Sequence, residues 1–375
     1  MKVALVHDQL MEFGGAERVL VTLKEMYPDA DVFTSFYNPA GLGSHRALIE
    51  GWNVRTSWAQ QVPLLDRFYS PLRSITPLIW ESMDFKGYDL VISSSGGYMC
   101  KGIVTRPETV HICYLHHQPR YLYYYETARE WQKYKLIEIY GNIINHNLRM
   151  WDYLGSQRVD HFVTNSEETK RRIQKFYRRD SDVIYPPVTV PQSFSTPFHH
   201  SSSSHYLTVS RLARAKHIDI LIDAANKFRF ELKIVGSGRD EHRLKSLAGK
   251  TVEFIGNVTD EELESLYTNA RGYLFAAVDE EFGIAPIEAM GYGLPVIAYS
   301  SGGVRETVKP GTNGYLYDEL TAESLYEQLQ KLEKLSNAKY DEMSQAARDE
   351  AQQYSIASFK KQFGAYVDKK LASIT

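Results

Sequence analysis

Residues 278–307, with the sequence VDEEFGIAPIEAMGYGLPVIAYSSGGVRET, form the stretch that decides the fold. The apolar run before it, GYLFAA at 272–277, predicts a buried strand of a parallel sheet. Pro286 then stands where the first turn of a helix tolerates proline. The stretch therefore predicts a strand, a loop and a helix, and Glu288 lies about one turn into that helix.

Two glutamates, Glu280 and Glu288, flank the turn made by Phe282 and Gly283, with seven residues between them. At the carboxyl end of a parallel strand, the first N–H groups of the next helix point into a crevice that favours phosphate. The groups that we expect there belong to Gly283, Ile284 and Ala285. Glu288 is placed to reach the hydroxyls of a ribose beyond the phosphate, and Glu280 to reach a sugar on the far side. The pattern indicates a nucleotide-sugar site.

Two cations are expected to offset these acids, because two carboxylates beside a diphosphate would repel it. Arg211 and Lys216 stand five positions apart, after the strand predicted at 206–209. A guanidinium and an ammonium at such a strand-to-helix junction can meet phosphate oxygens. No Asp-x-Asp pattern is flanked by strand signals, so we expect a site that works without a metal ion.

Shorter motifs accompany these residues along nearly the whole chain. They are HDQLMEFGGAERVL (7–20), YDLVISSSGGYMCKG (88–102), YLHHQPRYLY (114–123), FVTNSEETKRRIQKFY (162–177), VIYPPV (183–188), VSRLARAK (209–216), VGSG (235–238) and FIGNV (254–258). In this order, and with the two glutamates and two cations, the chain resembles the family 4 retaining GT-B glycosyltransferases. Within that family it is most similar to the bacterial mannosyltransferase-like subgroup of surface polysaccharide (O-antigen type) assembly.

The resemblance implies a GT-B fold, an α/β architecture in which two Rossmann-like domains with parallel sheets face a central cleft. It implies that Glu288 holds the ribose, that Glu280 faces the transferred sugar, and that Arg211 and Lys216 neutralise the leaving diphosphate. It also implies same-face attack, in which the leaving phosphate oxygen accepts the proton of the acceptor. A covalent role for Glu280 is disfavoured, because double displacement needs a carboxylate on the opposite face and a second one as acid and base.

Alternating strand and helix patterns divide the chain into two halves. We expect an N-terminal acceptor-binding Rossmann-like domain at 1–186, a Pro- and Ser-rich linker at 187–205 and a nucleotide-sugar-binding Rossmann-like domain at 206–354. The resemblance implies that the helix-rich end of the chain, 355–375, crosses back to the N-terminal domain. Backbone groups near Val258 are expected to discriminate the base of the nucleotide.

The N-terminal half contributes two candidate features. Gly14 and Gly15 precede a predicted helix, and paired glycines let a ligand approach the backbone closely. A simple glycine turn is the alternative. His116 and His117 follow the strand predicted at 111–115, and the resemblance aligns the cleft histidine of its H-x-x-P-R-Y pattern with His116. A packing histidine is the alternative here, and the adjacent pair lacks the spacing of a zinc site.

Composition argues against several classes of protein. The formal net charge of -3 argues against a nucleic-acid binder. Two cysteines, Cys100 and Cys113, exclude a disulfide scaffold and fit a reducing cytoplasm. The first residues read as a strand rather than a secretory signal, and no run of about eighteen apolar residues predicts a membrane span. We therefore expect a cytoplasmic enzyme.

An aromatic and basic region of the N-terminal half suggests peripheral contact with the inner membrane surface. Tyrosines cluster at 121–125, with Trp131 after them, and the run KRRIQKFYRR at 170–179 carries six cations and no acid. Such a surface could face an anionic membrane that carries a polyprenyl-diphosphate-linked acceptor. Packed tyrosines and a solvated charged face are the alternative, as is sugar stacking on the aromatic rings.

The predicted function is transfer of a hexose from a nucleotide sugar to a glycan or lipid-linked glycan acceptor, with retention of the anomeric configuration and without a cofactor. Mannose from GDP-mannose is the leading donor, on the subgroup resemblance alone. A UDP-hexose-dependent transferase and a non-catalytic sugar-nucleotide-binding partner protein are the main alternatives. An epimerase and a pyridoxal-phosphate phosphorylase could share the architecture.

Overall fold

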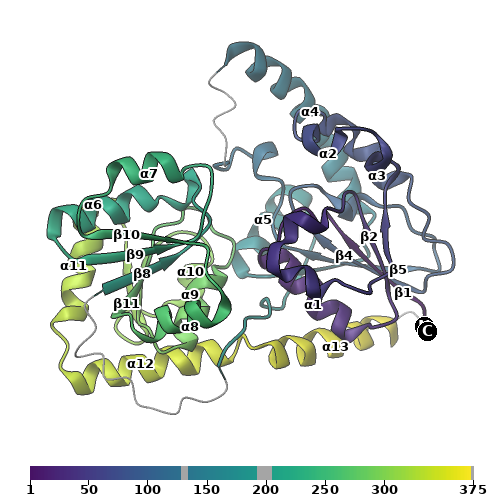
Figure 1. Ribbon diagram of the computed structural model, residues 1–375. Helices are drawn as coiled ribbons and strands as arrows, with labels where there is room; N and C mark the ends of the chain where they lie inside the picture. The colour runs from purple at the N-terminus through teal and green to yellow at the C-terminus, as the bar shows by residue number, and fades with distance from the viewer. Residues whose placement is uncertain (128–133, 192–204, 373–375) are drawn as a thin grey trace. The chain divides into compact units, whose positions relative to one another are not determined.

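The computed structural model describes residues 1–127, 134–191 and 205–372. These residues fall into two compact units, each built around one parallel β-sheet (Figure 1). Unit 1 contains residues 1–125, 134–187 and 359–372, and unit 2 contains residues 126–127, 188–191 and 205–358. The end of the chain therefore belongs to the same unit as its beginning.

Within the described residues, unit 1 has a seven-stranded sheet in the order β3-β2-β1-β4-β5-β6-β7, and all neighbouring strands are parallel. Its strands are β1 (Val3–His7), β2 (Asp31–Thr34), β3 (Val54–Thr56), β4 (Leu90–Ser95), β5 (Val110–Leu115), β6 (His161–Thr164) and β7 (Asp182–Val183). Every residue of β1, β4 and β5 is buried, as expected for central strands covered on both faces.

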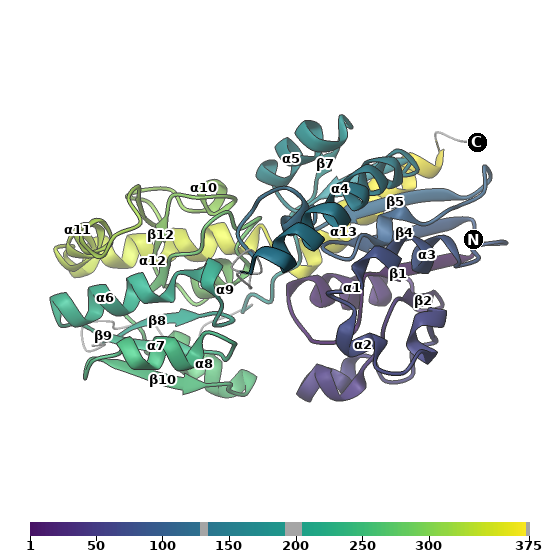
Figure 2. The same cartoon turned by 90° about the horizontal axis from the view of Figure 1, so that it is seen from above.

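The helices of unit 1 are α1 (Gly15–Met26), α2 (Leu65–Phe68), α3 (Thr76–Glu81), α4 (Lys135–Gln157), α5 (Glu167–Tyr177) and most of α13 (Ile356–Ala372). Although α13 follows unit 2 in the chain, it returns to unit 1 (Figure 2). There Phe359 and Phe363 are buried, with ring centroids 5.8 and 6.2 Å from that of Tyr114 on β5. Apolar contacts thus fasten the end of the chain to the core of unit 1.

The segment expected to be a linker, 187–205, already packs on unit 2 at its second residue, Val188. Val188 is buried, and its N–H donates to the carbonyl of Tyr354 at 2.9 Å. Residues 192–204 lie outside the described part of the chain, and the next strand begins at His205. Gln352 Nε2 also donates to the carbonyl of Pro191 at 3.0 Å. The Pro- and Ser-rich composition does not indicate this packing.

The described part of unit 2 has a six-stranded parallel sheet in the order β10-β9-β8-β11-β12-β13. Its strands are β8 (His205–Val209), β9 (Glu231–Val235), β10 (Val252–Gly256), β11 (Gly272–Phe275), β12 (Val296–Tyr299) and β13 (Gly314–Tyr317). Its helices are α6 (Ile218–Phe228), α7 (Glu241–Leu247), α8 (Asp260–Thr268), α9 (Ile284–Gly291), α10 (Val304–Thr307), α11 (Ala322–Glu333) and α12 (Asn337–Gln352). Among the helices of the described ranges, none is both long and apolar enough to span a membrane.

Each sheet has one place where the strand order reverses. In unit 1 the chain moves outward from β1 to β2 and β3, and β4 then returns to the other side of β1. In unit 2 it moves from β8 to β9 and β10, and β11 then returns to the other side of β8. Loops that leave two such strands diverge and open a crevice at the carboxyl ends, where ligands bind. Ligand sites are therefore expected at β1/β4 and at β8/β11.

Candidate functional site

Lys216 and Glu280 meet at the switch point of unit 2. Lys216 ends the turn η8 (Arg214–Lys216) after β8, and Glu280 follows β11. Lys216 Nζ lies 2.5 Å from Glu280 Oε2, and the two side chains are 24% and 21% exposed. The N–H of Val278 also joins the two loops, because it donates to the carbonyl of Ala215 at 3.1 Å. The structure thus brings the predicted cation and acid together as an ion pair.

Two glycines after β12 hold the backbone at Glu280. Asp279 has a φ of +54°, a left-handed value that is costly for a non-glycine residue and frequent at functional sites. A Cβ added at Gly302 would stand 2.0 Å from the carbonyl oxygen of Glu280. The N–H of Gly303 donates to the same oxygen at 2.8 Å. Gly302 and Gly303 therefore position this carbonyl, a role that the sequence pattern did not reveal.

Replacing Gly302 with alanine is expected to displace the Glu280 loop, and Gly311→Ala is its matched control. Both glycines have positive φ, +67° and +78°, but nothing lies within 4 Å of a Cβ added at Gly311. Both variants therefore carry the left-handed backbone cost of about 1–2 kcal/mol, and only Gly302→Ala adds a clash with backbone. Thermal unfolding and calorimetry should show a larger stability loss and weaker donor binding for Gly302→Ala. Equal behaviour of the two variants would contradict this role.

The helix α9 begins as the sequence predicts. Gly283 precedes it with a φ of +92°, and Pro286 lies in its first turn. Phe282 is buried beside this start. Glu288 lies one turn further along and is half-buried, and Tyr267 Oη donates to its Oε2 at 3.5 Å. Glu280 and Glu288 therefore lie at the two ends of one short segment, which consists of the loop after β11 and the start of α9.

Arg211 and Val258 lie on loops that leave the same end of the sheet. Arg211 is exposed after β8, and Val258 is half-buried after β10 at the edge of the sheet. The loop after β9 supports the segment that carries Arg211. A Cβ added at Gly236 would stand 2.1 Å from the carbonyl oxygen of Ser210, so the VGSG turn needs glycine at this position.

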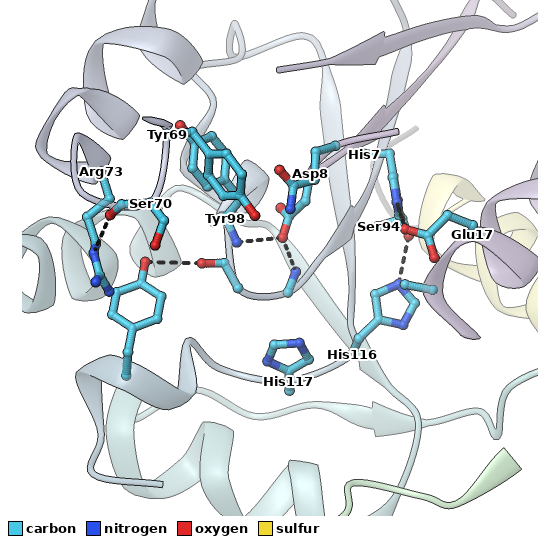
Figure 3. Close-up of a pocket in the computed structure, with 15 residues that line it drawn as sticks. His7, Asp8, Glu17, Tyr69, Ser70, Arg73, Ser94, Tyr98, His116 and His117 are labelled. Carbon is cyan, nitrogen blue, oxygen red and sulfur yellow. Dashed lines mark hydrogen bonds and ion pairs between the residues drawn. The ribbon is translucent and has the colours of Figure 1, made fainter. Parts of the chain in front are cut away.

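A cavity of about 330 Å³ lies at the switch point of unit 1 (Figure 3). It lies beside the carboxyl ends of β1, β4 and β5 and is lined by polar and aromatic side chains. They include His7, Asp8, Arg73, Tyr98, His116 and His117. All residues that line the cavity belong to unit 1.

Both candidate histidines line this cavity. His116 directly follows β5 and is 8% exposed. Its backbone N–H donates to the carbonyl of Ser95 at 2.8 Å, and its backbone carbonyl accepts from Asn165 Nδ2 at 2.9 Å. His117 is half-buried, and its Nδ1 lies 2.8 Å from the carbonyl oxygen of Gln118. The choice of His116 as the functional histidine stays a prediction.

Gly14 and Gly15 start α1, but the N–H of Gly14 already has a partner. Gly14 is the N-cap residue, and its N–H donates to Glu17 Oε2 at 2.8 Å. Gly15 is exposed and is the first residue of the helix. The close approach of a ligand to these two glycines stays a prediction, and at Gly14 the side chain of Glu17 folds back and caps the helix.

Asp8 shapes the loop after β4, although no motif singled it out. Its Oδ2 accepts the N–H groups of Gly96 and Tyr98 at 2.9 and 2.7 Å, and its Oδ1 accepts that of Cys100 at 2.8 Å. Three N–H donors to one buried carboxylate fix this loop. The local signal was only an acidic residue soon after the apolar strand.

Two family models match the chain in succession. The model described as Glycosyltransferase Family 4 matches residues 13–191, and the model described as Glycosyl transferases group 1 matches residues 196–350. Among solved structures, Anabaena Alr3699/HepE in complex with UDP and glucose matches with a TM-score of 0.72 and 20% identity. This match covers 98% of this chain and 99% of that chain. The two models together span residues 13–350, and the chain has the GT-B fold.

Curated relatives of the chain carry different names. The UDP-N-acetylglucosamine–peptide N-acetylglucosaminyltransferase GtfA subunit of Streptococcus agalactiae is 31% identical over 48% of this chain, which is 38% of the relative. The alpha-1,3/1,6-mannosyltransferase alg2 of Schizosaccharomyces pombe is 25% identical over 84% of this chain and 70% of the relative. The chain spans half or less of the length of the four GtfA subunits that it matches.

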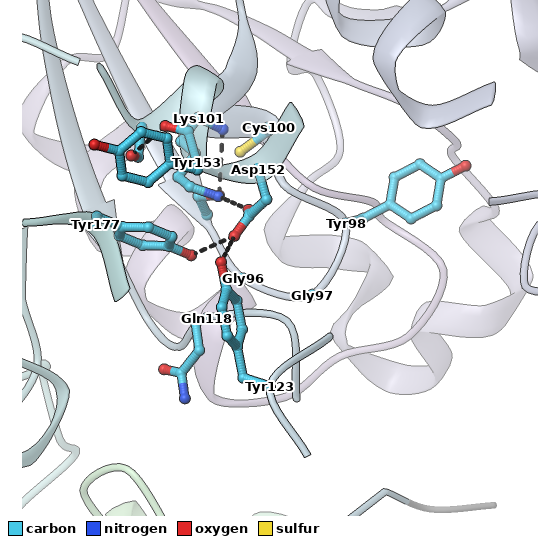
Figure 4. Close-up of polar contacts among 12 residues, drawn as sticks. Gly96, Gly97, Tyr98, Cys100, Lys101, Gln118, Tyr123, Asp152, Tyr153 and Tyr177 are labelled. Atoms are coloured by element: carbon cyan, nitrogen blue, oxygen red, sulfur yellow. Dashed lines mark hydrogen bonds and ion pairs between the residues drawn. The ribbon is translucent and has the colours of Figure 1, made fainter. Parts of the chain in front are cut away.

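A buried cluster joins the cavity loops of unit 1 to α4 (Figure 4). Lys101 Nζ donates to Asp152 Oδ1, and the hydroxyls of Tyr123 and Tyr177 donate to Asp152 Oδ2 at 2.7 and 2.8 Å. Lys101 follows β4 and Tyr123 follows β5, so Asp152 ties both loops to one helix. Burial, and then the charge of Asp152, raises the pKa of Tyr177 well above its ordinary value. Residues 51 positions apart form the ion pair, and no local pattern predicts it.

The basic run at 170–179 is less available to a membrane than its sequence indicated. Arg172 is 3% exposed, and its Nε lies 3.0 Å from Glu168 Oε1. Arg179 donates to three backbone carbonyl oxygens. Trp131, in the aromatic region, lies outside the described residues.

Proposed function

We propose that the chain is a retaining hexosyltransferase that moves mannose from GDP-mannose to a glycan or lipid-linked glycan acceptor in polysaccharide biosynthesis, without a metal ion. The observation that carries the proposal is the Lys216–Glu280 ion pair at the β8/β11 switch point, followed within one loop by Glu288 on α9. The subgroup resemblance and the 25% identity to the alg2 mannosyltransferase favour mannose.

The proposed chemistry requires stabilisation of the leaving diphosphate. The bond between the anomeric carbon and the phosphate oxygen breaks, and the acceptor oxygen bonds to the same face of that carbon. The acceptor proton moves to the departing phosphate oxygen. Lys216 and Arg211 stabilise the charge that builds on the diphosphate, because fixed cations act most strongly where charge develops. Glu288 binds the ribose, and Glu280 faces the sugar once Lys216 turns to phosphate.

The cavity of unit 1 is the proposed acceptor side. Tyr98 and Tyr121 line it with aromatic surface on which a sugar ring can stack. Arg73 Nε donates to the carbonyl of Ser70 at 3.0 Å, and its guanidinium lies 4.2 Å from the ring centroid of Tyr121. A cation held in this way suits an acceptor that carries phosphate. His116 orients a hydroxyl of the acceptor or of the donor sugar.

A UDP-hexose-dependent transferase is the second candidate. It is favoured by the solved structure with UDP and glucose, whose fold this chain shares, and by the GtfA relatives, whose name specifies UDP-N-acetylglucosamine. The residues proposed for the ribose and the diphosphate serve both donors equally. Only the contacts to the base, expected near Val258, and to the sugar differ between them.

Release of nucleoside diphosphate separates the candidates. The full chain is incubated with GDP-mannose, UDP-glucose or UDP-N-acetylglucosamine, with and without a polyprenyl-diphosphate-linked oligosaccharide. We expect GDP release from GDP-mannose that rises with acceptor. Release from a UDP sugar alone would establish the second candidate, and binding without release would indicate a non-catalytic partner protein. Thermal shifts with GDP and UDP give an independent measure of the base, because a ligand that binds only the folded state raises Tm.

Glu288→Ala is expected to weaken GDP binding by roughly 10- to 100-fold. Loss of charged hydrogen bonds to the ribose corresponds to about 1.5–3 kcal/mol. Isothermal titration calorimetry measures the Kd, and Glu327→Ala, on the exposed side of α11, is the control. Unchanged affinity of the Glu288 variant would remove the ribose role.

Contact with the cytoplasmic face of the membrane is proposed to run through α4. Five of its apolar side chains are between 49% and 83% exposed: Leu136, Ile139, Ile143, Met150 and Leu154. They recur at helical spacing on the side opposite the buried Asn145 and Leu148. An apolar helix face with an exposed lysine, Lys135, at its start suits the boundary of an anionic bilayer, where a lipid-linked acceptor would lie.

The double variant Leu136→Glu/Ile143→Glu is expected to lose most of its sedimentation with phosphatidylglycerol-containing vesicles. Each apolar side chain that enters the bilayer boundary contributes up to about 1.5–3 kcal/mol. Leu247→Glu, on α7 of unit 2 and 45% exposed, is the matched control and should bind vesicles like the wild type. Vesicle binding that survives the double variant would exclude this face.

A further inference from the structure

We infer that Glu17, His7 and Ser94 form a hydrogen-bonded relay that fixes which nitrogen of His116 carries the proton. The four side chains follow one another along the wall of the unit 1 cavity (Figure 3). His7 ends β1 and pairs in register with Ser94 on β4. All four are buried, with exposed fractions between 1% and 9%. Water therefore competes little for their hydrogen bonds.

The contacts run in an unbroken line. Glu17 Oε1 lies 3.2 Å from His7 Nε2, and His7 Nδ1 lies 3.0 Å from Ser94 Oγ. Ser94 Oγ lies 2.7 Å from His116 Nε2. The nearby acid Asp8 stays outside this line, because both of its oxygens accept backbone N–H groups.

The carboxylate of Glu17 determines which atom donates in each hydrogen bond of the relay. The other oxygen of Glu17 accepts the N–H of Gly14, and the first turn of α1 favours a negative charge there. An ionised carboxylate only accepts hydrogen bonds, so His7 carries its proton on Nε2. When His7 is neutral, the lone pair on its Nδ1 accepts the hydroxyl of Ser94. The oxygen of Ser94 then accepts from His116, whose proton is therefore on Nε2 and whose lone pair is on Nδ1.

This tautomer makes Nδ1 of His116 a hydrogen-bond acceptor. A histidine of that polarity accepts a hydroxyl proton, whereas the opposite tautomer donates to an oxygen. Glu17, His7 and Ser94 are thus positioning residues that act through His116. This deepens the proposed role of His116 beside the acceptor, and only that consequence rests on the proposed function.

Glu17→Gln tests the relay, because it reverses its direction. The N–H of Gly14 needs an oxygen, so it holds the amide oxygen of the new side chain and turns the NH2 group toward His7. His7 Nε2 then accepts and its proton lies on Nδ1, so Ser94 donates to His116 Nε2. In the full-length chain with 15N-labelled histidine, the shifts of His116 are expected to show Nε2–H in the wild type and Nδ1–H in Glu17→Gln.

Ser94→Ala interrupts the relay and is the matched control. In this background Glu17→Gln should still reverse His7 and leave His116 unchanged. The signals of His116 are assigned by their loss in His116→Ala. A wild-type His116 protonated on Nδ1 overturns the inference even if Glu17→Gln does not fold, and so does a His116 that keeps Nε2–H while His7 reverses. No donor or acceptor enters these spectra, so the relay and the proposed transfer reaction fail independently.

Discussion

Lys216→Ala is expected to lower kcat by about 100- to 1,000-fold, the effect typical of removing one charge-stabilising donor from a transition state. Lys216 is the cation that the fold holds against Glu280 at the β8/β11 switch point, where a departing diphosphate would lie. Its removal takes away a positive charge and also leaves Glu280 without this counter-ion beside an anionic substrate. Release of nucleoside diphosphate at saturating donor and acceptor measures kcat.

Two further variants separate catalysis from simple charge balance. In Lys216→Ala/Glu280→Gln the carboxylate that repels the anionic donor is gone as well. The affinity for the donor should therefore be higher than in Lys216→Ala, while kcat stays low. Lys227→Ala removes another lysine that pairs with a glutamate in unit 2, and activity should stay near that of the wild type because this pair lies on the surface. A Lys216→Ala enzyme with nearly wild-type kcat would remove Lys216 from the leaving-group site.

The strands were predictable because parallel strands buried on both faces read as continuous apolar runs. The apolar run is shorter than the strand in two cases. The run of β1 stops at Val6 and that of β4 at Ile92, but the strands continue to His7 and Ser95. The polar ends of these strands include His7 and Ser94, which line the cavity. Apolar periodicity therefore ends where the polar residues of the site begin.

The residues of unit 2 were easier to predict than those of unit 1. Glu280, Gly283 and Glu288 lie in one segment whose order along the chain already describes the turn. In unit 1 the carboxylate of Asp8 bonds to backbone N–H groups 88 to 92 positions away. Only the register of β1 with β4 brings them together. Such contacts depend on the topology of the sheet. Short motifs read from one sequence carry no information about that topology.

Asp152→Asn is expected to destabilise unit 1 by about 3–5 kcal/mol, the largest stability effect among these variants. The amide keeps the shape of the carboxylate and can still accept from Tyr123 and Tyr177. It does not neutralise the ammonium of Lys101, which is fully buried and has lost its counter-charge. Urea unfolding followed by circular dichroism measures the loss.

The double variant Asp152→Asn/Lys101→Met separates the charge from the packing. It removes both buried ions, so most of the lost stability should return, because replacing a buried pair is often close to neutral. A single variant as stable as the wild type would show that the ion pair does not hold α4 to the cavity loops.

In the double variant Asp152→Asn/Lys101→Met, Tyr123 can still donate its hydrogen bond to the amide oxygen of residue 152, so the loop after β5 stays fastened to α4. If this fastening positions His116, the double variant should retain activity that Tyr123→Phe lowers, because the phenyl ring removes the bond to Asp152 and preserves the packing against Phe176.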